Sequence, residues 1–285
     1  MKNWNILLSK YNNLVISEKL ILVNILCFFI PFFINTLFFL FNIESENYIS
    51  FVELSSDISS IFYKPWTLIT YSFFHTRLSH LFWNMLILYY SSSIFLNLFK
   101  KDTFINVYFM GVIFGGLFFE ISYLVFPVFQ GSFPVMIGAS AGVMSILIFV
   151  CTYSPNNEIR LLFFNIKLKY IGIALIAVDL VMIPYGNSGG RISHLGGAFL
   201  GYLYAKSISN GRDIGTKFQN IWKYFINFFS NSKLNIVHEK KSDNVDSKVD
   251  NYNQNEIDKI LDKISKSGYD SLTNKEKETL FNAGK

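Results

Sequence analysis

Three short groups of polar residues interrupt the apolar segments of this 285-residue sequence. The first group contains His75, His80 and Asn84, the second is centred on Ser140, and the third on His194. A serine beside a histidine is the smallest unit of nucleophilic catalysis, because the imidazole accepts the hydroxyl proton as the oxygen attacks. His80 and Asn84 are four residues apart and share one helix face, where their N–H groups could stabilise an oxyanion. The residue types therefore indicate acyl-transfer chemistry, if the fold brings the three groups together.

The segments that carry these groups are too apolar for an ordinary soluble domain. Hydrophobic residues make up 51% of the sequence and charged residues 16%, where soluble domains carry about 25% charged residues. A helix needs about 20 apolar residues to cross a bilayer. Six segments predict an all-α, polytopic membrane protein with a six-transmembrane-helix bundle: Leu20–Phe41, Leu78–Phe99, Phe104–Phe126, Ala139–Tyr153, Leu168–Pro184 and Ile192–Ser207.

The fourth of these segments is short, and residues that break helices precede it. Pro127, Gly131 and Pro134 predict irregular backbone before the segment begins. Irregular backbone at membrane depth survives only inside protein or beside a water-filled cavity. Because Ser140 opens the fourth segment, we expect the candidate nucleophile to lie beside a cavity below the membrane surface.

The lysine and arginine residues predict an orientation. With the N-terminus inside, twelve of them flank the segments on the inner side and three on the outer side, namely Lys64, Arg77 and Arg191. Positive residues favour the cytoplasmic side, so both termini are expected in the cytoplasm. No cleavable signal peptide is evident, and the Asn, Lys, Ile and Phe bias suggests an AT-rich genome. We therefore expect a multi-pass protein of the cell inner (plasma) membrane with its active site open to the outer side.

This orientation puts the three polar groups at one depth. The second, fourth and sixth segments all run from the outer to the inner side, and each carries its polar group near its start. Small residues permit close helix packing: Gly138 precedes Ser140, and Gly197 and Gly201 form a G-x-x-x-G face after His194. We expect the fourth and sixth helices to bring Ser140 and His194 within hydrogen-bonding distance.

In this order and on these helices, the motifs resemble the rhomboid family of intramembrane serine proteases, over residues 20–208. The resemblance implies a catalytic dyad of Ser140 and His194, with an oxyanion held by the Ser140 backbone N–H, His80 and Asn84. Four residues are expected to support this site: His75, Gly138, Gly197 and Gly201. The implied substrates are single-span proteins of the lipid bilayer, cut beside a small residue where their helix is unstable. The family needs no cofactor.

The sequence offers little to a metal ion or a nucleic acid. His75 and His80 are five residues apart and do not share a helix face, and Cys27 and Cys151 are isolated in apolar segments. We therefore expect no metal site. The net charge of +5 belongs to the apolar part of the chain, where membrane topology accounts for the basic residues, so no nucleic-acid partner is expected.

Some alternatives stay open. Asp179, in the middle of the fifth segment, is either a third member of a catalytic triad or a structural or protonated residue, and the family's dyad favours the second interpretation. Glu120 and Arg191 are expected near the outer surface without an assigned role. Instead of a protease, the chain could be a catalytically inactive rhomboid-like factor that binds and escorts membrane proteins. A transporter is disfavoured, because the sequence lacks two matching halves with broken spans.

Residues 1–210 are predicted to form the catalytic membrane domain, and three further parts follow. Residues 211–230 contain the amphipathic segment Lys217–Phe229, which predicts an interfacial helix or, alternatively, a packed helix of a small domain. Residues 231–255 are polar and predict a linker. Residues 256–285 predict a short cytoplasmic helical hairpin, in which Thr273 and Glu276 form a capping box. The sequence does not identify a partner for this tail.

Overall fold

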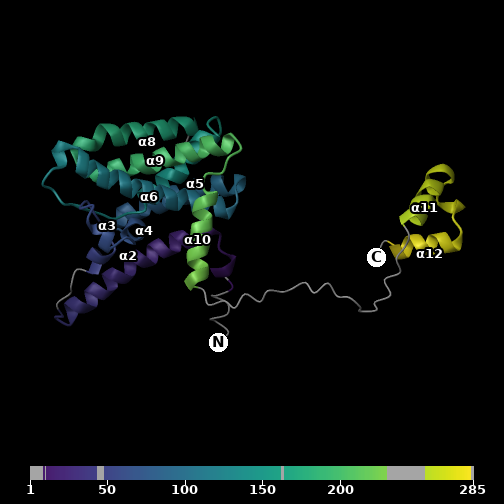
Figure 1. The fold of residues 1–285 in the computed structure, drawn as a ribbon, viewed down its shortest axis with the longest axis horizontal. Helices are drawn as coiled ribbons and strands as arrows, with labels where there is room; N and C mark the ends of the chain where they lie inside the picture. Colours follow the sequence, from purple (N-terminus) through teal and green to yellow (C-terminus); the bar gives the residue numbers. More distant parts are fainter. Residues whose placement is uncertain (1–8, 10, 44–47, 162–163, 230–253, 284–285) are drawn as a thin grey trace. The chain divides into compact units, whose positions relative to one another are not determined.

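The computed structural model describes residues 9, 11–43, 48–161, 164–229 and 254–283. The chain divides into two compact units, Met1–Asn231 and Ser232–Lys285, and helices dominate the described part of both (Figure 1). The larger unit contains the three polar groups. It is built mainly from α2 (Ile16–Leu40), α5 (Leu78–Leu98), α6 (Lys101–Val125), α7 (Ser140–Tyr153), α8 (Leu168–Met182) and α9 (Ser188–Ser209).

Four helices of the described residues are long and apolar enough to cross a membrane. They are α2, α5, α6 and α8, the last counted with its 3₁₀ extension η4 (Ile183–Tyr185). α7 has only 14 residues, and glycine and serine residues lower the hydropathy of α9. Each predicted apolar segment lies on one of the six helices, although α2 and α9 each begin four residues earlier than predicted.

α7 forms the centre of the larger unit. Residues 141–151 are all buried, and α5, α6, α8 and α9 pack around them. A Cβ atom added to Gly197 would lie 2.1 Å from the Ala141 carbonyl oxygen, and one added to Gly201 would lie 2.3 Å from that of Ser145. Only glycine permits such an approach. The two glycines of the G-x-x-x-G face therefore pack the backbone of α9 against that of α7.

The backbone before α7 is irregular, as its prolines and glycine predict. It contains the 3₁₀ turn η3 (Pro127–Phe129) and the short strand β2 (Val135–Met136), which pairs antiparallel with β1 (Leu54–Ser55). The loop between α2 and α5 also contains η1 (Tyr48–Phe51), α3 (Ser60–Tyr63), α4 (Thr67–Thr70) and η2 (Tyr71–Phe73). Tyr71 ties this loop to the bundle, because its hydroxyl donates to the Val112 carbonyl oxygen at 2.7 Å and its own carbonyl accepts from Gly138 N at 2.9 Å.

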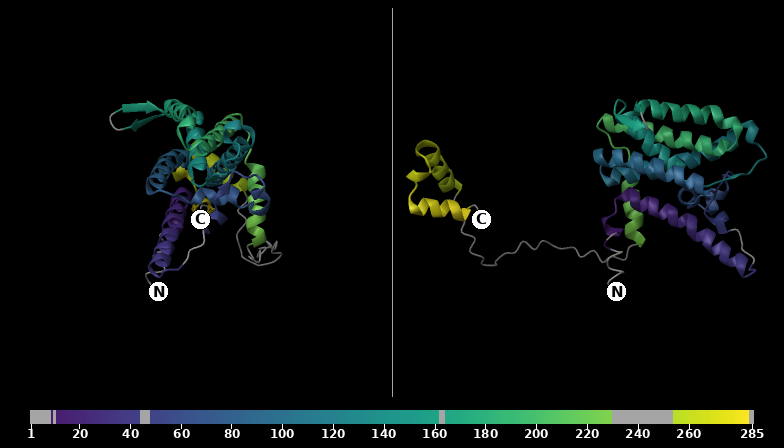
Figure 2. Two further views of the ribbon diagram at one scale, coloured as in Figure 1. Left: turned by 90° about the vertical axis from the view of Figure 1, so that its left-hand side faces the viewer. Right: turned by 180° about the vertical axis from the view of Figure 1, so that it is seen from behind.

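A β-hairpin joins α7 to α8. Strands β3 (Glu158–Leu161) and β4 (Phe164–Lys167) pair antiparallel, with Ile159 opposite Ile166, and project from the helices (Figure 2). Branched and aromatic residues favour this extended backbone. The all-α prediction is therefore correct only as a mostly helical fold.

The last helix of the larger unit is α10 (Thr216–Phe229), at the predicted amphipathic segment. It packs against α6: the Trp222 ring stacks on Phe109 with ring centroids 5.7 Å apart, and Gln219 donates a hydrogen bond to Asp102. These contacts attach α10 to the larger unit rather than to a separate small domain.

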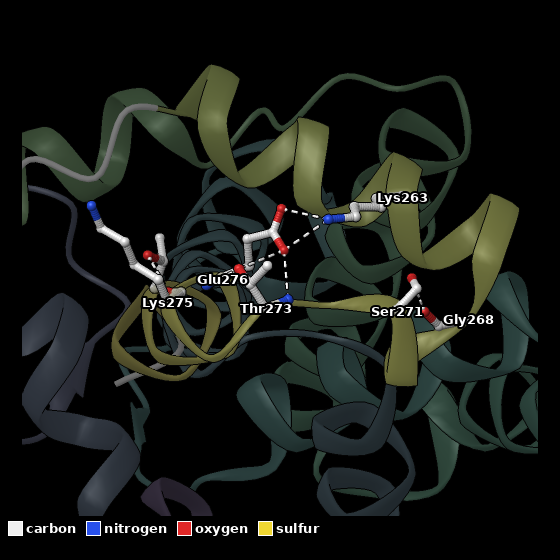
Figure 3. Close-up of polar contacts among 7 residues, drawn as sticks. Lys263, Gly268, Ser271, Thr273, Lys275 and Glu276 are labelled. Atoms are coloured by element: carbon white, nitrogen blue, oxygen red, sulfur yellow. Dashed lines mark hydrogen bonds and ion pairs between the residues drawn. The ribbon is translucent and has the colours of Figure 1, made fainter.

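The smaller unit is a helical hairpin of α11 (Gln254–Ser267), η5 (Tyr269–Ser271) and α12 (Asn274–Ala283). The predicted capping contacts are present, because Glu276 Oε2 accepts from Thr273 N at 2.7 Å and Thr273 Oγ1 accepts from Glu276 N at 3.4 Å. Lys263 of α11 reaches the same carboxylate at 2.9 Å and ties the two helices together (Figure 3). Most of the predicted linker 231–255 lies outside the described residues.

Candidate active site

A cavity of about 870 Å³ opens where the N-terminal ends of α5, α7 and α9 meet. Ser140 and His194 both line it, together with His80 of α5. The remaining wall comes from the start of α5, the end of α6, the backbone before α7 and the start of α9, and includes Trp83, Tyr123, Met136 and Asn187. The structure thus brings one member of each polar group to a single cavity.

Ser140 is the first residue of α7, and Gly138 shapes the turn that presents it. The first N–H groups of a helix have no intrahelical partner, so a backbone donor accompanies the Ser140 side chain. Gly138 has a φ of 141°, a conformation that favours glycine. A Cβ atom at this position would lie 2.6 Å from His80 Cε1. The missing side chain therefore lets the His80 ring lie against the turn.

One ring nitrogen of His194, the candidate general base, faces a carboxylate. Nδ1 lies 3.0 Å from Asp179 Oδ2 of α8, and Asp179 Oδ1 accepts from Arg191 Nη1 at 3.2 Å. Arg191 precedes His194 by three residues in α9, so one turn of helix presents both side chains to Asp179. Asp179 therefore contacts the candidate base directly, whereas the sequence had favoured a structural or protonated residue over a third member of a catalytic triad.

His75 and Asn84 make contacts of a different kind. His75 Nε2 accepts from Ala139 N at 3.3 Å and lies 3.3 Å from Asn84 Nδ2. Both partners are N–H donors, so Nε2 is the acceptor and Nδ1 carries the proton. Burial, with a smaller contribution from nearby His80, lowers the pKa of His75 to about 3. The ring is therefore neutral and links the start of α5 to the residue before Ser140.

The side chain of Asn84 is less free to donate to an oxyanion than the sequence suggested. Its Nδ2 also donates to the carbonyl oxygen of His80 at 3.0 Å, so both amide hydrogens are engaged. The side chain is buried, and Asn84 is not one of the described residues that line the cavity. Contact with an oxyanion would require it to exchange one of these two partners.

The structure also describes the two charged residues that had no assigned role, Arg191 and Glu120. Arg191, which had no assigned role, belongs to the site through Asp179; its position one turn before His194 is the sequence signal that could have indicated this. Glu120, which also had no assigned role, is fully buried in α6, five residues before the end of that helix. Neither of its carboxyl oxygens has a hydrogen-bond partner among the described residues.

Fold and site together define a helical, membrane-type protein with a serine and a histidine on the wall of one cavity. The chain belongs to the rhomboid family: the Rhomboid domain matches residues 63–211, more than half of the chain. Residues 246–282 match a second family, a family of unknown function (DUF6576).

Individual relatives agree with this assignment. The chain is 31% identical over 173 residues to the presenilin-associated rhomboid-like protein, mitochondrial, of Mus musculus, covering 59% of this chain and 42% of the relative. It is 30% identical over 158 residues to RHOMBOID-like protein 12, mitochondrial, of Arabidopsis thaliana, covering 51% of this chain and 47% of the relative. The chain thus spans less than half the length of these relatives.

The comparisons correct the predicted location. The mouse and Arabidopsis relatives, like a zebrafish relative, are named as mitochondrial proteins, so the prediction of a cell inner (plasma) membrane is wrong. The predictions of cytoplasmic termini and of an active site open to the cell's outer side depended on that membrane and fall with it. The physical reason is that lysine and arginine counts orient a helix bundle relative to a bilayer but carry no information about which membrane receives it.

Proposed function

We propose that this protein is an intramembrane serine endopeptidase with six membrane-spanning helices, which cleaves membrane proteins in or near their transmembrane segments. The observation that carries the proposal is the placement of Ser140 and His194 on one cavity wall, with His194 Nδ1 engaged by Asp179. Because Nδ1 is engaged, Nε2 is the ring nitrogen left to act on Ser140. Membership of the rhomboid family supports the same conclusion.

The chemistry follows from these two side chains. His194 Nε2 accepts the Ser140 hydroxyl proton as Oγ bonds to the scissile carbonyl carbon, which gives a tetrahedral oxyanion. The imidazolium then protonates the leaving amine nitrogen as the C–N bond breaks. Water from the cavity, deprotonated by the same imidazole, hydrolyses the acyl-enzyme and restores Ser140. The cycle requires no cofactor.

The oxyanion is stabilised by donors at the start of two helices. The Ser140 backbone N–H lies at the positive end of α7, and His80 faces the same cavity from α5. Asn84 joins them when it releases His75 or the His80 carbonyl. Such donors act strongly in a site sheltered from bulk water, because they need no reorganisation as the charge develops.

Single-span membrane proteins are the proposed substrates. A peptide bond inside a transmembrane helix has its carbonyl hydrogen-bonded and shielded by side chains, so the helix must unwind before Ser140 can attack. An aqueous cavity at the ends of α5, α7 and α9 offers polar partners to the unwound backbone. Segments with weak helix propensity are therefore cleaved most readily.

Cleavage of a single-span test substrate by the purified protein in liposomes tests the proposal. The wild-type protein is expected to cut it, and Ser140→Ala is expected to leave it intact. Ser145→Ala is the matched control, since Ser145 lies on the same helix and donates to the Val107 carbonyl oxygen instead of lining the cavity. A wild-type protein that binds the substrate and never cuts it would favour the inactive escort factor.

The six-span arrangement has a separate test, because α7 is short for a membrane crossing. Cysteines are placed at Ser50 and at Asn156 in a chain whose Cys27 and Cys151 are replaced by alanine. α5, α6 and α7 lie between the two positions, so three crossings put them on opposite sides of the membrane. An impermeant thiol reagent added to one side should label one of them alone. Labelling of both from one side would show that α7 does not cross.

A further inference from the structure

The carboxylate of Asp179 bridges two side chains of α9. Its two oxygens are divided between them: Oδ2 lies 3.0 Å from His194 Nδ1 and Oδ1 lies 3.2 Å from Arg191 Nη1. The side chain of Asp179 is 10% exposed, and those of its two partners are each 22% exposed. Arg191 is held in turn, because its Nε donates to the Gly186 carbonyl oxygen at 3.2 Å. Three hydrogen-bonding contacts thus fix the positions of Asp179, Arg191 and His194 on the packed helices α8 and α9.

Charge explains how such a carboxylate persists at the end of a membrane helix. An isolated ionised carboxylate is costly to bury, and a cationic partner with hydrogen bonds offsets much of that cost. Arg191 supplies the partner from the next helix. Its guanidinium occupies one oxygen of Asp179 and leaves the other to the imidazole.

The ionised carboxylate also selects the tautomer of His194. A carboxylate only accepts hydrogen bonds, so its contact with Nδ1 requires the proton on that nitrogen. A neutral imidazole has one N–H, which leaves Nε2 with a free lone pair. A general base for Ser140 needs this tautomer, and the opposite one cannot accept the hydroxyl proton.

Other charged groups oppose the imidazolium that forms when His194 takes that proton. His80 of α5 interacts electrostatically with His194 and with Arg77, and Arg191 lies one turn away on α9. These groups are positive or can become so. Asp179, from α8, is the group in this set that stabilises a positive imidazole.

We propose that Asp179 is a positioning residue for His194, fixing its Nδ1–H tautomer and stabilising its protonated form, and that Arg191 holds Asp179 in place. This inference rests on the proposed function. It extends the catalytic unit beyond the serine and histidine, and it assigns the pair on α8 and α9 a kinetic role as well as a structural one.

Asp179→Asn tests the proposal through kinetics and pH dependence. The amide keeps the shape but can donate to Nδ1, which favours the wrong tautomer, so kcat should fall by about 10²–10⁴ with little change in KM. The amide carries no negative charge to stabilise the protonated imidazole, so the acid limb of kcat/KM should move to lower pH. Asp213→Asn is the matched control: Asp213 accepts from Tyr204, at the other end of α9, and its variant should keep both kcat and the limb.

Arg191→Gln provides an independent second test. Loss of the positive charge should move the acid limb to higher pH, opposite to Asp179→Asn, with a smaller fall in kcat. If Asp179→Asn does not fold, the direction of the shift in Arg191→Gln tests the proposal on its own. An acid limb that stays in place in the folded variants, or a kcat within about threefold of wild type in Asp179→Asn, overturns the inference. A wild-type protein that cuts no substrate overturns the proposed function instead, so the two failures are distinguishable.

Discussion

His75 lies in the backbone just before α5 and His194 lies in the second turn of α9, and the partners of their rings differ in kind. His75 is surrounded by N–H donors, from Ala139 and Asn84, and its pKa is lowered to about 3. His194 faces a carboxylate that is itself paired with arginine. The first environment keeps a ring neutral and fixed, and the second engages one ring nitrogen, Nδ1, and leaves Nε2 to the cavity side. The partners of a histidine therefore indicate its role better than its proximity to the nucleophile does.

The sharpest way to break this comparison is to remove the proposed nucleophile and base. Ser140→Ala and His194→Ala should each lower kcat by on the order of 10⁶, and the double variant should be no worse than either, because the residues act as one unit. Initial rates on the single-span test substrate provide the measurement. Cleavage by Ser140→Ala at more than a trace of the wild-type rate would exclude Ser140 as the nucleophile.

A comparison of His80 with His75 sharpens the distinction. His80 lines the cavity, so His80→Ala should cost about 10²–10³ in kcat, the effect of one lost oxyanion donor. His75→Ala removes hydrogen bonds that only position Ala139 and Asn84, and about tenfold is expected, equivalent to roughly 1.4 kcal/mol. Steady-state kinetics rank the two variants. Equal losses would show that His75 acts directly on the reacting atoms.

Gly138 gives a smaller effect, which depends on space as well as backbone conformation. Alanine there combines a strained φ with a Cβ 2.6 Å from His80 Cε1, so we expect kcat to fall by about 10–100-fold and stability by about 1–3 kcal/mol. Gly131 is the matched control, because its φ of 78° is also positive but nothing lies within 4 Å of the added Cβ. Gly131→Ala should lose stability and keep kcat. Equal kinetics would remove the contact with His80 from the explanation.

The tail is expected to have the smallest effect on cleavage, but the stability of its own hairpin should depend on pH through Glu276. Hydrogen bonds from the Thr273 backbone, then from Lys263, lower the pKa of Glu276 to about 2 from an ordinary 4.5. Its stabilisation of the hairpin is therefore complete above about pH 4.5 and is lost as pH falls towards 2. Hydrogen exchange in α12 of the full chain should show this loss, and Glu276→Gln should abolish the pH dependence.

Cleavage itself should be insensitive to the same unit. Because each unit is compact by itself and the cavity lies in the larger one, a chain ending at residue 231 should keep kcat within about twofold. Inactivity of a folded truncated protein would make the tail a regulator of the site.

Much of the architecture could be predicted because membrane segments carry a strong signal. The apolar lengths predicted the positions of α2, α5, α6 and α8, and the small residues around Gly197 predicted the close approach of α9 to α7. The β3–β4 hairpin was missed because Glu158–Lys167 is too short to cross a membrane and lies between two apolar segments, where only a connecting loop was expected.

The sequence indicated which side chains of α7 and α9 approach one cavity, but it did not fix the contact between α8 and α9. Ser140 and His194 were indicated by their positions at the starts of segments of the same direction. The contact between Asp179 and His194 stayed only one of two alternatives, because it depends on the turn between α8 and α9, where Asn187 has a φ of 51°. A spacing of fifteen residues across such a turn does not fix which side chains meet.

The burial of α7 has a consequence for sequence drift. Every side of this helix from residue 141 to 151 faces another part of the protein. An added methyl group therefore has no lipid to expand into and must displace a neighbouring helix, and a deleted one leaves a cavity. α2 is the opposite case, with Phe33, Phe39 and Leu40 more than 60% exposed. Saturation mutagenesis should therefore find α2 tolerant of nearly any apolar exchange and α7 intolerant of most, which makes the helix that carries Ser140 the slowest part of this protein to diverge.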